Sequence, residues 1–303
     1  MGKLVDPHGL DPCSEIRVSV RLRLSAQAEV TETAKPRWSR ANGLGVRLSF
    51  SVQKNIIIWF LCVSLIFTKT INMKLSIIIP SRNEERYING VLDSIYESNI
   101  PFDFEVIVAD NSTDSTRQVI IRHHPQVKII QGGTVSEGRN NGAKHAKGEY
   151  LIFMDADITF ADETLIAKTV RHLENKYDMV TTRLSCDNDL LADIMYGVCN
   201  LIQLGAKLEG KPFSTGCFMG IKRSVFEKLN GFDESLHFAE DYHLSRRIDR
   251  KKFKIIRNST IYTDNRRFKK IGYFGLMKQF GRIALSRYDK NDESFKKDIG
   301  YWE

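Results

Sequence analysis

The feature that most constrains this sequence is an alternation of two residue patterns between positions 74 and 182. Short runs of β-branched and other apolar residues have the length of buried strands, at 75–79, 104–109, 127–130, 150–154 and 179–182. Segments between them space apolar residues as helices do, at 86–97, 137–147 and 161–174, with a further helix capped by Ser112 or Thr113. This alternation with short connections predicts an α/β fold, a mostly parallel, Rossmann-like sheet with helices on both faces.

Three polar clusters directly follow strands of the predicted sheet. They are residues 81–84 after the first strand, residues 110–112 after the second, and residues 155–157 after the fourth. Sheets of this kind bind ligands outside the carboxyl ends of their strands. The three clusters are therefore expected to meet at one edge of the sheet and to form a site there.

Asp155 and Asp157 are the two acids of the third cluster, separated only by Ala156. Their oxygens are the ligands that Mg²⁺ or Mn²⁺ prefers, and such ions often share their ligands with substrate phosphates. An Asp-x-Asp pair taken alone is better explained as a solvated acidic loop. Its position after a buried strand, at the ligand edge, favours a divalent metal site instead.

Three further residues near this edge have two interpretations each. Asp110 can accept a hydrogen bond from a base or a ribose hydroxyl, or it can form an Asx turn into the next helix. Glu84 is either a ligand contact or an acid of the kind favoured in the first turn of a helix. Arg139 can contact a base or a phosphate, or it can be a solvated surface arginine. The residue pattern alone leaves these alternatives open.

Seven short motifs follow one another along the chain. Those in the first half read IIPSRNEE, ADNSTD, GRNNGAKHAKG and MDAD, and those in the second half read STGCFMG, GFDE and EDYHLSRR. As an ordered set they resemble glycosyltransferase family 2, whose enzymes have the GT-A fold. The resemblance covers about residues 73–265, with the donor half at 73–182 and the acceptor half at 183–265.

The resemblance implies a role for each matched residue of the donor half. It places Pro80, Arg82 and Glu84 along the nucleotide, with Glu84 near the ribose or base. It turns Asp110 toward the base and Arg139 toward the base or the phosphates. At the metal site it assigns Asp157 as a direct ligand, with Asp155 contacting the ribose and metal-bound waters, and Ala156 between them. The implied donor is a nucleotide-diphosphate sugar.

In the acceptor half the resemblance implies that Asp241, next to Glu240, is the general base. Loss of a proton from an acceptor hydroxyl, with attack opposite the leaving group, would invert the anomeric carbon. The alternative for this acidic pair is a helix start, where acids are common. The implied activity is an inverting, metal-dependent glycosyltransferase of the EC 2.4 class.

The sequence departs from the family pattern at a few positions. Arg82 stands where an aromatic residue is usual, and Asn230 replaces the first glycine of Gly-Gly-Phe-Asp. The Gln-x-x-Arg-Trp motif of processive synthases is missing, which favours transfer of a single sugar. A sugar-phosphate nucleotidyltransferase would need a glycine-rich loop after the first strand, where residues 81–84 contain no glycine. A non-catalytic nucleotide-sugar or lipid-binding protein of the same fold is the remaining alternative.

The flanking segments differ from this domain. Residues 1–72 are expected to be a poorly ordered extension or a weak anchor, with an apolar run at 56–67 that is shorter than the ~20 residues of a spanning helix. The apolar stretch 190–208 predicts either a buried helix or one lying on a bilayer. Residues 266–288 contain seven Lys or Arg and no acid, which predicts a basic amphipathic helix before a charged tail.

Charge and cysteine content bear on partners and compartment. The formal charge of +8 suggests an anionic partner, yet much of it lies outside the core domain, so nucleic acid is not expected. The acceptor is expected to be a glycan, lipid-linked or other hydroxyl compound. Five scattered cysteines fit a reduced cytoplasmic compartment, with peripheral contact to the anionic inner face of a membrane as a further expectation.

Overall fold

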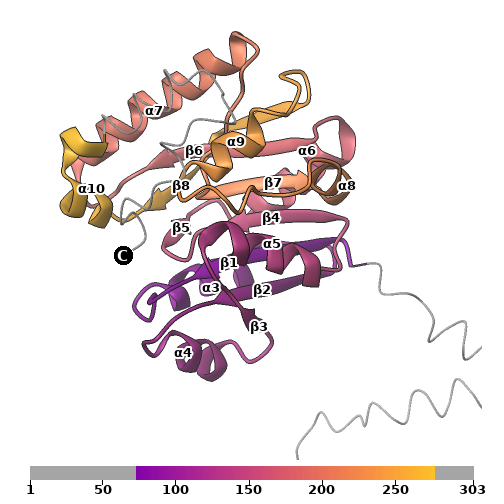
Figure 1. The fold of residues 1–303 in the computed structure, drawn as a ribbon, viewed down its shortest axis with the longest axis vertical. Coiled ribbons are helices and arrows are strands. Elements are labelled where there is room, and N and C mark those ends of the chain that lie inside the picture. The colour runs from indigo at the N-terminus through magenta and orange to yellow at the C-terminus, as the bar shows by residue number, and fades with distance from the viewer. Residues whose placement is uncertain (1–72, 277–303) are drawn as a thin grey trace, which may run out of the picture. The chain divides into compact units, whose positions relative to one another are not determined.

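The structure is a computed structural model that describes residues 73–276. Its sheet has eight strands in the order β3-β2-β1-β4-β7-β6-β8-β5 (Figure 1). Strands β3, β2, β1 and β4 pair in parallel, β7 pairs antiparallel with both β4 and β6, β6 and β8 are parallel, and β5 is antiparallel to β8. The bounds are Leu75–Ser81 (β1), Phe104–Asp110 (β2), Lys128–Gln131 (β3), Tyr150–Met154 (β4), Ile158–Phe160 (β5), Met179–Ser185 (β6), Phe218–Lys222 (β7) and Phe253–Thr263 (β8).

Helices cover both faces of this sheet, as predicted. Their bounds are Ile88–Tyr96 (α3), Thr116–His123 (α4), Val135–His145 (α5), Leu165–Asn175 (α6), Leu190–Leu208 (α7), Arg223–Lys228 (α8), Glu240–Ser245 (α9) and Arg266–Ile271 (α10). Successive residues of a strand point to opposite faces, so Ile77 and Ile79 enter one core while Ile78 enters the other. Helices α3, α4, α6, α7 and α10 contribute to the first core, and α5, α8 and α9 contribute to the second.

The five strands predicted from sequence are all present, as β1, β2, β3, β4 and β6. The pattern missed β5, because three residues are too few to display a period. It also gave no assignment for β7 and β8. Strand β7 enters the sheet between β4 and β6 and reverses the direction there. The predicted mostly parallel α/β sheet is confirmed, with β5 and β7 as its antiparallel members.

Four predicted helix starts differ from the structure. Helix α3 begins at Ile88 instead of 86, and α6 begins at Leu165 instead of 161. Helix α4 begins after Ser115, not after Ser112 or Thr113, because the Ser112 hydroxyl donates to Asp110 and accepts from the backbone N–H of Asn83. Helix α5 begins at Val135, ahead of the expected start at residue 137. There a capping box sets the start, in which the Thr134 N–H donates to Glu137 Oε2 (2.7 Å) while Thr134 Oγ1 accepts from the Glu137 N–H (3.3 Å).

The apolar stretch 190–208 forms α7 with the predicted bounds. It is not a buried helix, because only Ala192, Tyr196 and Gln203 are fully buried in it. Among residues 73–276, none of the helices has the length and apolar composition needed to cross a bilayer. Of the predicted basic helix, α10 lies within the described range, whereas residues 1–72, with the apolar run 56–67, and those after 276 lie outside it.

Candidate active site

A cavity of about 780 Å³ opens at the carboxyl ends of β1 and β4, where the sequence predicted a site. It is closed on its other sides by the start of α5, the segment before α9, and two cations of α10. Seven of the predicted site residues line it: Pro80, Arg82, Glu84, Asp155, Ala156, Asp157 and Glu240. Three others, Asp110, Arg139 and Asp241, do not line the cavity.

The loops that follow β1 and β2 are bound to each other beside this cavity. The Asn83 backbone N–H donates to Ser112 Oγ (2.8 Å), and Asn83 Oδ1 accepts from the Thr113 N–H (2.9 Å). Asn83 has a φ of 60°, a conformation that non-glycine residues rarely adopt. Such strain persists only where the surrounding contacts hold it, and it is frequent at functional sites.

One arginine, Arg266 of α10, joins two of the cavity carboxylates. Its Nη2 lies 2.6 Å from Glu84 Oε1 and 2.7 Å from Asp157 Oδ2, and its Nη1 lies 2.8 Å from Glu84 Oε2. The guanidinium also stacks over Tyr87, with its carbon 4.6 Å from the ring centroid. We call Glu84, Asp157 and Arg266 the open cluster, since the Arg266 side chain remains 37% exposed.

The open cluster concentrates negative charge at the mouth of the cavity. Burial raises the pKa of Glu84, the Arg266 pairing lowers it, and the nearby Asp157 and Asp155 carboxylates raise it. Sequence reasoning missed Arg266, which lies 182 positions from Glu84. The available signal was its place directly after the end of β8, on the basic segment that begins there.

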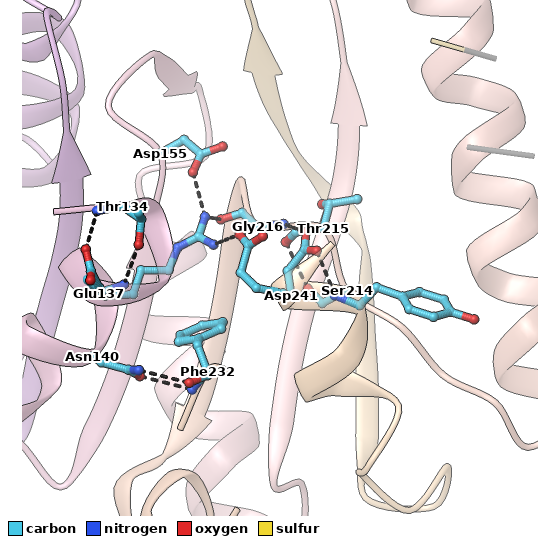
Figure 2. Close-up of polar contacts among 12 residues, drawn as sticks. Thr134, Glu137, Asn140, Asp155, Ser214, Thr215, Gly216, Phe232 and Asp241 are labelled. Carbon is cyan, nitrogen blue, oxygen red and sulfur yellow. Dashed lines mark hydrogen bonds and ion pairs between the residues drawn. The ribbon is translucent and has the colours of Figure 1, made fainter. Parts of the chain in front are cut away.

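A second arginine, Arg139 of α5, is enclosed by the protein. Its Nη2 lies 2.9 Å from Asp155 Oδ1 and donates to the Gly216 carbonyl (3.2 Å), while its Nη1 pairs with Glu240. Figure 2 shows this region between Asp155, Gly216 and Asp241. The side chain is only 1% exposed, so the interpretation of Arg139 as a solvated surface residue is wrong. We call Arg139, Asp155 and Glu240 the buried cluster.

Helix α5 uses the buried cluster and its neighbour Asn140 to join the two halves of the chain. Asn140 Nδ2 donates to the Phe232 carbonyl (2.9 Å), and Asn140 Oδ1 accepts from the Phe232 N–H (3.0 Å), as Figure 2 shows. A Cβ at Gly216 would lie 2.5 Å from Arg139 Nη2, so a larger residue there would require the guanidinium to shift. These contacts give Arg139 and Asn140 of the Gly-Arg-Asn-Asn motif a structural role that is independent of any ligand.

The acidic pair Glu240 and Asp241 opens α9. Ala239, just before it, has a φ of 59°, and this left-handed turn sets the direction in which α9 begins. Asp241 accepts hydrogen bonds from the Gly216 and Tyr242 backbone N–H groups, the second at 2.7 Å. Burial and the Glu240 charge raise the pKa of Asp241 to about 7, even though Arg139 and the two hydrogen bonds lower it.

Asp110 is held at the end of β2, with only 3% of its surface exposed. Its Oδ1 accepts from the hydroxyls of Ser81 (2.8 Å) and Ser112 (2.6 Å), and its Oδ2 lies 3.4 Å from Arg117 Nε. These partners hold the carboxylate between the end of β1 and the segment that follows β2. The contact of Asp110 with a base stays a prediction.

The donor set of the cavity fits a hard divalent cation. Asp157 and Asp155 supply carboxylate oxygens, and the guanidinium of Arg266 already shows that a positive charge is stable between Asp157 and Glu84. Within residues 73–276 there is no group of three or more His, Cys, Asp or Glu placed to hold a metal. A metal here would need further oxygens from phosphate or water, which is the usual arrangement for Mg²⁺.

The chain is similar in sequence to known glycosyltransferases. A family model described as "Glycosyl transferase family 2" matches residues 76–230. The poly(ribitol-phosphate) beta-N-acetylglucosaminyltransferase TarS of Staphylococcus aureus strain Mu50 is 40% identical over 101 residues, 31% of this chain and 18% of that protein. A poly(ribitol-phosphate) beta-glucosyltransferase of Bacillus spizizenii is 35% identical over 121 residues, 37% of this chain and 19% of that protein. The matched region spans about a fifth of each relative's length.

The fold is similar to that of a solved mannosyltransferase. This protein, PcManGT from Pyrobaculum calidifontis in complex with GDP-Man and Mn²⁺, gives a TM-score of 0.52 at 20% identity, covering 76% of this chain and 73% of that one. At this level of identity the likeness concerns the fold alone. It confirms the GT-A type fold that the motifs led us to expect.

Proposed function

Because the chain belongs to glycosyl transferase family 2, we propose that it transfers a single sugar from a nucleotide-diphosphate sugar to an acceptor hydroxyl, with inversion. The observation that carries the proposal is the open cluster. It places Glu84 and Asp157 in a cavity at the carboxyl ends of parallel strands, where sheets of this kind bind nucleotides. Residues 73–265 would form the transferase domain.

On the donor side, the cavity residues would bind the nucleotide and its diphosphate. Asp157 and Asp155 would hold a divalent ion, Mg²⁺ or Mn²⁺, which supplies positive charge against the leaving diphosphate. The structure of PcManGT contains Mn²⁺ together with a nucleotide sugar, which supports this expectation for the fold. Pro80 and Arg82 line the same wall as Glu84 and would contact the nucleoside.

Arg266 would have to change partners when the donor binds. Its guanidinium pairs with Asp157 and Glu84, the carboxylates that the ion and the nucleoside would approach. When the metal ion binds Asp157 and the nucleoside contacts Glu84, the Arg266 guanidinium would lose both partners. It and Lys270 are the cations of α10 that line the cavity. Both are suited to pair with phosphate oxygens.

On the acceptor side, Asp241 would take the proton from the attacking hydroxyl. A pKa near 7 suits a general base, because the group is then ionised at working pH and still basic enough to accept a proton. Glu240 is the neighbouring candidate, since it lines the cavity, but its carboxylate is paired with Arg139. Asp241 would need to turn from the Gly216 and Tyr242 N–H groups toward the acceptor.

The proposal is tested by a screen of nucleotide-sugar donors in the presence of Mn²⁺, with released nucleoside diphosphate as the readout. Turnover with one donor should stop on addition of EDTA and return on addition of Mn²⁺ or Mg²⁺. NMR of the product should show an inverted anomeric carbon. Full turnover after rigorous chelation would overturn the metal requirement, and tight donor binding without turnover would point to a binding protein of the same fold.

A further inference from the structure

Helix α7 presents an apolar face to the outside, in addition to the apolar side chains, such as Ala192 and Tyr196, that it packs into the core. Every exposed residue in it is aliphatic, with exposed fractions from 39% to 77%: Leu190, Leu191, Ile194, Val198, Leu201, Ile202 and Leu208. Single exposed leucines are common on proteins, but a contiguous apolar patch marks an interaction site. We call these seven residues the α7 stripe.

Polar side chains on the inner side of α7 fix its orientation. Asp193 Oδ1 accepts from Ser185 Oγ (2.5 Å) and from the Cys186 N–H (3.2 Å). Asn200 both donates to and accepts from the Leu184 backbone, at 2.8 and 3.0 Å. These bonds to β6 and the residue after it would break if the helix rotated to bury its stripe. The outward placement of the aliphatic residues is therefore built into the fold.

The α7 stripe extends along the whole helix. It runs from Leu190 to Leu208, a length of about 27 Å at ~1.5 Å per residue. A Cβ at Gly197 or Gly205 would meet nothing within 4 Å, so the space over the helix is open at both glycines as well. Figure 1 shows α7 at an outer edge of the sheet domain, with α10 beside one end.

Cations lie at both ends of the stripe. At its start, α10 is tied to Asp189 by Asn265 Nδ2 (3.0 Å) and by the Tyr273 hydroxyl, and it carries the exposed Lys269 and Lys270. The next segment presents Phe274, which is 82% exposed. Phe274 therefore adds an exposed aromatic side chain near the start of the stripe, and Lys269 and Lys270 add positive charge there.

At the other end, Arg250 Nη1 donates to the Leu208 carbonyl (2.9 Å). Burial lowers the pKa of Lys207, and the positive charges of Lys254 and Arg257 lower it further. Exposed acids near the two ends include Asp187, Glu209 and Asp249, and the cations named here outnumber these three. An aliphatic stripe with cationic ends matches a bilayer interface. Acyl chains would contact the apolar side chains, and anionic headgroups would pair with the lysines and arginines.

We propose that the α7 stripe docks the protein on a membrane surface that contains anionic lipid, with α7 lying in the plane of the interface. Arg266 and Lys270 of α10 also line the cavity, so docking would hold the cavity close to the membrane. An acceptor hydroxyl carried by a lipid suits this arrangement. That last consequence rests on the proposed function, whereas docking itself does not.

The test is cosedimentation of the full chain with vesicles of phosphatidylcholine, alone or mixed with phosphatidylglycerol. The wild-type protein should bind the mixed vesicles, and added salt should weaken that binding. The triple variant Leu190→Ser, Ile194→Ser, Leu201→Ser should bind at least about tenfold more weakly, because it removes apolar side chains from the interface. The matched control is Ile121→Ser, which changes a 58% exposed residue on α4 and should bind as the wild type does.

Three results would overturn the proposal. The first is a wild-type protein that does not bind mixed vesicles, and the second is a triple variant that binds them as well as the wild type. The third is a wild-type dimer in light scattering that the triple substitution converts to a monomer, since a second copy would then cover the stripe. Urea unfolding of each variant checks that the fold is intact. Vesicle binding needs no turnover, so its failure leaves the proposed function standing.

Discussion

Two arginines each bridge two carboxylates in this protein, in very different surroundings. Arg139 is 1% exposed and joins Asp155 to Glu240, whereas Arg266 is 37% exposed and joins Glu84 to Asp157. Removing one partner from a buried ion pair leaves a charge without water or a counterion, which is strongly destabilising. Removing one from a partly exposed pair costs less, because water can replace it in part.

This difference suggests that the buried cluster stabilises the fold, whereas the carboxylates of the open cluster can change their partner from Arg266 to a ligand. The buried cluster holds the end of β4 to α9 and so fixes the donor side relative to the acceptor side. The open cluster lines the cavity and can release Arg266 to a ligand at small cost. Substitutions in the two clusters should therefore have different signatures, loss of stability in one and loss of binding in the other.

The largest expected effect is that of Arg139→Ala. It leaves Asp155 and Glu240 buried without their counterion, so the free energy of unfolding should fall by about 3–5 kcal/mol. Arg266→Ala is the matched control and should cost less than Arg139→Ala, because the Arg266 guanidinium is 37% exposed, although Glu84 and Asp157 are mostly buried. Urea unfolding of both variants measures the difference. Equal losses would contradict the division into a buried and an open cluster.

Asp241→Asn should affect turnover more than stability at neutral pH. The amide keeps the size of the side chain but cannot accept a proton, so turnover should fall by roughly 10²–10⁴-fold. Affinity for the nucleotide should change little, because Asp241 does not line the cavity. Near-normal turnover would remove Asp241 as the base, and equal losses of binding and turnover would make it structural. Glu240→Gln tests whether the neighbouring acid is the better assignment.

The raised pKa of Asp241 also predicts a dependence of stability on pH. Its folded-state pKa of about 7 exceeds the ordinary value of 3.8, so the folded protein retains a proton that the unfolded chain has lost between these values. Stability should therefore decline as pH rises from about 4 to 7. Urea unfolding against pH should show this slope in the wild type and a smaller one in Asp241→Asn. An unchanged slope would assign the effect to other groups.

Asp157→Asn should lower turnover by about 10²–10³-fold, the usual loss when one electrostatic contact to a transition state is removed. The stability of this variant should stay near that of the wild type, because Arg266 remains paired with Glu84. Asp155→Asn should do less damage to turnover but should lower stability, because Asp155 belongs to the buried cluster. Steady-state kinetics and urea unfolding of both variants distinguish the two acids. The reverse order would contradict their assignment.

The smallest expected effect is that of Arg266→Gln on metal binding. Without the guanidinium, Asp157 and Glu84 are free for a cation, so Mn²⁺ should bind the nucleotide-free protein about two- to fivefold more tightly. Lys269→Gln, on the same helix but not lining the cavity, is the control for loss of one positive charge. Titration followed by electron paramagnetic resonance measures free Mn²⁺ directly. Weaker binding in Arg266→Gln would mean that the arginine supports the metal instead of replacing it.

The sequence predicted what depends on local pattern. Glu84, Asp155 and Asp157 follow the ends of β1 and β4 as expected. A short apolar strand and the polar residues after it lie within a few positions of each other, so the local sequence is enough to predict them. The sequence marked Arg266 only as the start of a basic segment, because its pairing with Glu84 depends on where α10 packs. The burial of Arg139 likewise depends on Gly216 and Glu240, which are supplied by the other half of the chain.

The most direct test of the open cluster as the donor site is calorimetric titration of UDP and GDP into the full chain, with and without Mn²⁺. The wild type should bind at least one of them, more tightly when Mn²⁺ is present. Asp157→Asn should lose most of the Mn²⁺ dependence, while Ile121→Ser should retain it. If the wild type and Asp157→Asn bind the nucleotide equally tightly, with and without Mn²⁺, the open cluster is not the donor site.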